Sequence, residues 1–60
     1  MRLLSVSEFC QQSGISRALF YKLVREGNGP RIMKVGRRTL ISGQAAEEWQ
    51  RAMEVPRQAA

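Results

Sequence analysis

Apolar residues recur at helical spacing in three short segments, and a serine precedes each segment. The spacing predicts helices over 6–12, 17–26 and 43–53. Ser5, Ser16 and Ser42 each stand where a hydroxyl can accept from the free amides of a first helical turn. The apolar residue before each serine can form a hydrophobic staple, and Glu8 completes a capping box with Ser5. The sequence therefore predicts three capped helices.

The apolar side of each predicted helix supplies the core. Ser13 and Gly14 predict a turn after the first helix, and the glycines and proline of 27–30 end the second. Trp49 is expected in the core, packed on Phe9, Phe20 or Leu40. The residues expected to face inward are Val6, Phe9, Cys10, Phe20, Leu23, Val24, Ala45, Ala46, Trp49 and Met53.

Two β-prone runs, 31–35 and 39–41, lie between the second and third helices. The Gly-containing turn between them predicts a hairpin with its tip near Gly36 and Arg37. Ile32 and Met33 are adjacent, so alternation is imperfect and the register stays open. The predicted fold is mainly α with a small β-hairpin. Residues 1–55 form one domain and 56–60 a flexible C-terminal tail.

Residues 13–25 have the form of a helix-turn-helix, because a very short turn joins two helices. On the second helix, positions at i, i+4 and i+8 line one polar ridge beside the apolar stripe. Arginine can bond guanine bidentately, alanine can meet a thymine methyl, and tyrosine or lysine can reach phosphates. The alternative is the ordinary solvated side of an amphipathic helix. The candidate DNA contacts here are Ser16, Arg17, Ala18, Tyr21, Lys22 and Arg25.

The positive charge is concentrated in the middle of the chain. Ten Lys or Arg and five Glu give a net charge of +5, but residues 17–38 alone carry +6 and the remainder −1. Such a field favours a polyanion as partner. Four cations lie in the predicted hairpin, namely Arg31, Lys34, Arg37 and Arg38. They could follow phosphates or enter a minor groove. They could instead be a charged turn that keeps an edge strand soluble.

Several functions are disfavoured by composition. With one cysteine and no histidine, neither an internal disulfide nor a zinc site is available, and no cofactor is expected. Without His, Asp or a Gly-rich phosphate loop, an enzyme is not expected. Cys10 is predicted to be a small buried hydrophobe. The chain lacks an apolar run that could span a membrane and a secretory signal, so we expect no membrane contact and a cytoplasmic protein.

The motifs together resemble a known family. Seven short segments occur in the order and spacing of the excisionase and AlpA-type small helix-turn-helix proteins. They are Leu3 to Glu8, Gly14 to Arg17, Phe20 to Leu23, Glu26-Gly27, Pro30, Val35 to Arg38 and Trp49. These proteins are similar to a shortened MerR-like winged-helix domain. The resemblance covers about residues 3–53.

This resemblance implies a winged helix-turn-helix of three helices plus a wing, with the second helix in a major groove and the hairpin as the wing. It also implies a nucleoid-associated excisionase, the recombination directionality factor of a prophage or integrative element. Such a protein binds repeated sites in double-stranded DNA, self-associates there, bends the DNA and assists a tyrosine or serine recombinase (integrase). The implied contacts are Ser16, Arg17, Ala18, Tyr21, Lys22, Arg25, Arg37, Arg38 and Thr39.

Two other functions remain open at this point. The same motifs suit an AlpA-type transcriptional regulator of an integrase or phage gene. A basic face can also bind an acidic protein, which would make the domain a protein-interaction module. Binding to duplex DNA at low salt separates the last hypothesis from the other two.

Overall fold

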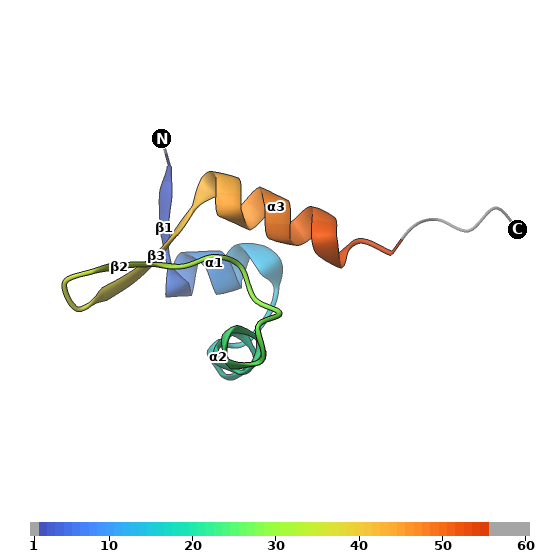
Figure 1. Cartoon of the computed structure of the whole chain (residues 1–60), viewed down its shortest axis with the longest axis horizontal. Helices are drawn as coiled ribbons and strands as arrows, with labels where there is room; N and C mark the ends of the chain where they lie inside the picture. Colours follow the sequence, from blue (N-terminus) through green and yellow to red (C-terminus); the bar gives the residue numbers. More distant parts are fainter. Residues whose placement is uncertain (1, 56–60) are drawn as a thin grey trace, which may run out of the picture.

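The computed structural model describes residues 2–55, so the expected flexible tail at 56–60 lies outside the described residues. Three helices and a small antiparallel sheet form a winged helix-turn-helix, which confirms the predicted fold class. Two helix ranges agree with the prediction, while the first helix is one residue longer. The elements are β1 (Leu3–Ser5), α1 (Val6–Ser13), α2 (Arg17–Glu26), β2 (Met33–Val35), β3 (Arg38–Ser42) and α3 (Gly43–Met53) (Figure 1).

Serine caps start all three helices, as predicted. The Ser5 hydroxyl accepts from the Glu8 amide at 3.0 Å, and the Glu8 carboxylate accepts from the Ser5 amide at 2.9 Å. Ser16 caps α2 through the Leu19 amide at 3.1 Å. Ser42 caps α3 in the same way, at 3.0 Å from the Ala45 amide. Each cap satisfies an amide that has no partner within its own helix.

A single left-handed residue makes the turn between α1 and α2. Gly14 has φ of 70° and ψ of 30°, which glycine adopts without steric cost. Its own amide and that of Ile15 both donate to the carbonyl of Cys10. The chain is therefore redirected within a few residues, and α2 crosses α1 to lie nearly end-on below it in the view of Figure 1.

The sheet contains a strand that the sequence did not predict. β1 pairs antiparallel with β3, and β2 pairs antiparallel with the other side of β3, in the order β1-β3-β2. Leu4 and Ile41 are directly paired and buried. Paired residues share a face of the sheet, so the face bearing Leu4 and Ile41 is the one packed on the helices. The β2–β3 hairpin projects beyond this packed region (Figure 1).

Phe9 of α1 lies at the centre of the core. Its ring meets those of Phe20 and Trp49 edge-on, with centroids 5.5 Å and 5.3 Å away. Burial of the inward-facing set is confirmed for most members, although Leu23, Val24 and Trp49 are only half-buried. The prediction for Met53 is wrong. This side chain is 47% exposed, because the last turn of α3 extends past α1 and the sheet (Figure 1).

Cys10 is buried, as expected, in the same cluster. Burial raises the pKa of its thiol above the ordinary value, because the charged thiolate is poorly solvated there. Arg17 acts weakly in the opposite direction. The thiol therefore packs as part of the core, and its thiolate form is disfavoured there.

Candidate nucleic-acid interface

One face of α2 is fixed against the core and leaves the opposite face free. Phe20 is fully buried, and Leu23 and Val24 beside it are half-buried. Gly27 ends the helix in a left-handed conformation, and its amide donates to the carbonyls of both Leu23 and Val24. Capped at both ends and anchored by an aromatic side chain, α2 presents its outer face on a rigid support.

All six candidate residues of the helix-turn-helix are exposed. At about 100° per residue, three of them lie opposite Phe20, namely Ala18, Lys22 and Arg25. Arg17 is in the first turn, next to the Ser16 cap. In a helix-turn-helix, the first turns of the second helix approach base edges most closely. At helical spacing, Arg17, Tyr21 and Arg25 follow one another along one side of α2, with Ala18 and Lys22 beside them.

Tyr21 lies on one flank of this outer face and Leu19 on the other. The Tyr21 ring packs edge-on against the buried Phe20 ring, with centroids 5.1 Å apart. This contact limits the positions that the exposed phenol can take. Leu19 is 40% exposed and was not among the residues predicted from the sequence to contact DNA. The sequence signal for its exposure is that Leu19 lies outside the apolar stripe of the helix. A leucine in this position can make apolar contact with a thymine methyl.

The hairpin has the predicted tip and a register that the sequence left open. Gly36 has φ of 61°, a conformation that permits the tight turn between β2 and β3. Val35 pairs with Arg38, and Lys34 pairs with Thr39. The Lys34 ammonium donates to the Thr39 hydroxyl at 3.0 Å, which fixes its side chain across the two strands.

This register divides the hairpin cations between two faces. Side chains alternate along a strand, so Lys34 and Thr39 share the face of the buried Ile41. Arg38 projects from the opposite face, with Val35. Arg37 occupies the turn itself. A duplex lying against one face of the hairpin would meet either Lys34 or Arg38 together with the turn. Thus these cations do not form a single patch.

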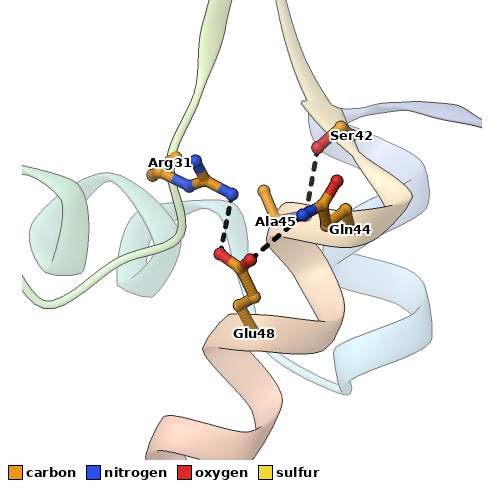
Figure 2. Close-up of polar contacts among 5 residues, drawn as sticks. All are labelled: Arg31, Ser42, Gln44, Ala45 and Glu48. Atoms are coloured by element: carbon orange, nitrogen blue, oxygen red, sulfur yellow. Dashed lines mark hydrogen bonds and ion pairs between the residues drawn. The ribbon is translucent and has the colours of Figure 1, made fainter.

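Arg31 lies apart from the other hairpin cations. Its guanidinium points to α3 and pairs with the Glu48 carboxylate at 2.7 Å, as Figure 2 shows. The second Glu48 oxygen accepts from the Gln44 side chain at 3.3 Å. The Arg31 and Glu48 side chains are 70% and 54% exposed, so water and salt screen the pair. No local pattern links residues this far apart, and the sequence prediction missed the pair.

Within residues 2–55 the structure has neither a cluster of metal-ligating side chains nor a membrane-spanning helix. No group of three potential metal-ligating His, Cys, Asp or Glu side chains gathers there. None of the helices in this part of the chain is sufficiently long and apolar to cross a bilayer.

Comparison with known families gives a decisive match. The model of a family described as a helix-turn-helix domain matches residues 3–54, which includes every helix and strand. The chain belongs to this family. It is the excisionase and AlpA-type family, so the resemblance read from the motifs is confirmed. Membership of this helix-turn-helix family implies sequence-specific DNA binding. Searches of curated proteins and of solved structures find no match.

Proposed function

We propose that this helix-turn-helix protein is an excisionase-type architectural factor. In this proposal α2 enters a major groove and the hairpin acts as a wing along the adjacent backbone or minor groove. The contacts are those predicted from the sequence, except for Arg31, which is paired with Glu48. The residues nearest the bases are Arg17, Ala18, Lys22 and Arg25. Tyr21 and the wing cations bind phosphates, as does the Ser16 hydroxyl beside the helix terminus.

The observation that carries the proposal is the outer face of α2. Ala18, Lys22 and Arg25 are exposed directly opposite the fully buried Phe20. A reading helix needs this arrangement, since base contacts require side chains held in place by a packed scaffold. The wing then supplies additional charge a short distance along the duplex.

In this role the protein performs no chemistry of its own and uses no cofactor. Several copies bind repeated sites side by side and bend the DNA, and a tyrosine or serine integrase carries out strand exchange on the bent complex. Bending a site of this length costs on the order of 1–6 kcal/mol, which the contacts of several protomers can offset. The protein acts at the nucleoid, in the cytoplasm.

The first test is selection of binding sites from random duplex DNA. An excisionase should enrich repeats in one orientation at near-helical spacing. One inverted repeat would instead identify a dimeric regulator of the AlpA type, and a reporter fused to the promoters of the element would then respond to the protein. No enrichment at all would contradict sequence-specific binding and favour an acidic protein as the partner of the basic face.

Two further measurements test the placement of the contacts and the bend. Lys22→Ala should weaken binding to the selected site by about 1 kcal/mol or more. Arg51→Ala removes the same charge from an exposed position of α3 and is the matched control, expected to have little effect.

A gel of circularly permuted fragments should reveal a bend on the selected repeats. Equal mobility of all fragments would contradict the architectural role.

A further inference from the structure

The linker between α2 and β2, residues 27–32, is bound to α3 by one hydrogen bond and one ion pair. The Trp49 indole donates to the carbonyl of Asn28 at 2.8 Å. Three residues later in the linker, Arg31 pairs with Glu48 at 2.7 Å (Figure 2). Because Glu48 and Trp49 are consecutive, one turn of α3 holds both the start and the end of the linker.

The linker is also constrained where it leaves α2. The amide of Asn28 donates to the Leu23 carbonyl at 2.8 Å, which closes the helix end. At Gly29 a Cβ atom would lie 2.9 Å from a Val24 methyl carbon, so only glycine fits the observed approach. Pro30, which follows, is buried and has a restricted φ. These contacts give the linker one direction away from α2.

The linker is the covalent connection between the two proposed DNA-contacting elements. α2 precedes it and β2 follows it, so its path, together with the pairing of β3 and β1, sets the distance and angle from the reading helix to the wing. We propose that Glu48 and Trp49 are positioning residues that hold the wing in register with α2 on one duplex. This inference rests on the proposed function, in which both elements contact the same DNA. Glu48 and Trp49 act through the linker and touch no nucleotide.

The expected size of the effect follows from how two linked contacts cooperate. Once α2 is bound, the wing binds intramolecularly, and its effective concentration depends on how narrowly its position is defined. Loosening the linker lowers that effective concentration without removing a DNA contact. The resulting loss of affinity can therefore never exceed the loss caused by removing the wing cations themselves.

Glu48→Ala tests the ion pair, with Glu47→Ala as a matched control. Both variants remove one negative charge from adjacent exposed positions of α3, and within residues 2–55 Glu47 makes no side-chain hydrogen bond or ion pair. The dissociation constant for the selected duplex is measured for each. Relative to Glu47→Ala, Glu48→Ala should bind DNA about twofold to fivefold more weakly. The effect is small because the lost Arg31–Glu48 ion pair is exposed and screened by water and salt.

Trp49→Phe tests the hydrogen bond from the Trp49 indole to the Asn28 carbonyl. Phenylalanine keeps an aromatic ring beside Phe9 but has no N–H to donate to Asn28. We expect binding about threefold to tenfold weaker, because the free energy of one hydrogen bond limits how far loosening the linker can lower the affinity. The thermal midpoint is measured alongside, so that loss of folding is separated from loss of positioning.

A wing-deficient background distinguishes positioning from a general structural effect. In a protein carrying Lys34→Ala, Arg37→Ala and Arg38→Ala, the wing has no cation left to position. There the Glu48→Ala and Trp49→Phe changes should alter affinity by less than about twofold, although their effects on the thermal midpoint should persist.

Three results would overturn the inference. Tighter binding and a steeper salt dependence for Glu48→Ala than for Glu47→Ala would mean that Glu48 only withholds Arg31 from DNA. If Glu48→Ala or Trp49→Phe weakened DNA binding just as much in the wing-deficient background, their effect would be a general structural one. If the wing-deficient protein bound DNA as tightly as the parent, the wing would make no contact that needs positioning. Failure of the parent protein to bind any duplex would instead refute the proposed function itself.

Discussion

The two cationic regions of the molecule are built in opposite ways. α2 is capped at both ends and anchored by the fully buried Phe20, and its outer residues form one continuous face. The hairpin has a three-residue strand with every member exposed, and its cations divide between two faces and a turn. Similar positive charge thus rests on a rigid support in one region and on a projecting ribbon in the other.

For the proposed mode of DNA binding, this difference predicts a division of labour between α2 and the hairpin. Base reading needs side chains held within a narrow range of positions, which a packed helix provides. Phosphate binding is tolerant of position, since the charge on the duplex backbone is regularly spaced. α2 is therefore suited to specificity and the hairpin to affinity.

Phe20→Ala should cause the largest change, a loss of about 3–5 kcal/mol from the free energy of unfolding, because it leaves a cavity beneath α2. Such a loss is a large part of the stability of any small domain. Val35→Ala, in the exposed hairpin, should change stability by less than about 0.5 kcal/mol. Urea denaturation measures both. Equal losses would show that the hairpin is as important to the fold as α2.

Arg17→Ala should cost about 1–3 kcal/mol in binding to the preferred duplex and relax the preference at one base pair. The reason is loss of a bidentate contact to guanine in the major groove. Binding is measured across a set of duplexes that differ by single substitutions. A uniform loss over the whole set would reassign Arg17 to the phosphate backbone.

Arg37→Ala should have a smaller effect that is the same for every sequence. Its removal should reduce the slope of log affinity against log salt by about one unit, as expected for one phosphate contact. The same duplex set, titrated at several salt concentrations, tests this. Loss confined to particular sequences would show that the hairpin tip also reads the DNA.

The smallest effect concerns Glu8, whose pKa lies below its ordinary value. The main cause is the hydrogen bond from the Ser5 backbone amide, followed by the Ser5 side chain, with weaker help from Arg2 and Arg38. A depressed pKa means that the stabilisation is present at neutral pH and is lost as pH falls through the folded-state pKa. Glu8→Gln should therefore flatten the decline of thermal midpoint between neutral and acidic pH. An identical decline in parent and variant would contradict this.

The helices and their caps were predictable because their signals are local. A serine and the amide that it caps are three residues apart, and an apolar stripe repeats within ten residues. The range of α2 and the exposure of Arg17, Lys22 and Arg25 therefore followed from the sequence. The Met53 error arose from the same reasoning, since helical spacing does not show where the neighbouring helix ends.

What the sequence did not predict depends on contacts between distant residues. β1 is three residues long and becomes a strand only because β3 pairs with it. The register that separates Lys34 from Arg38 is set by the same sheet. Arg31 was grouped with the hairpin cations, although Glu48 on α3 holds it elsewhere. An indole in a core usually needs a hydrogen-bond partner, but nothing local identifies the carbonyl of Asn28.

The pairing of β1 with β3 also has a consequence for folding. Because α1 and α2 lie between these strands in the sequence, β1 stays unpaired until a long loop of chain has closed. Until then Leu4 and the apolar side of α1 have no sheet to cover them. Contacts between such distant segments form late and slow the folding of small domains. The helix-turn-helix should therefore gain its full packing in one late step, when β1 pairs with β3.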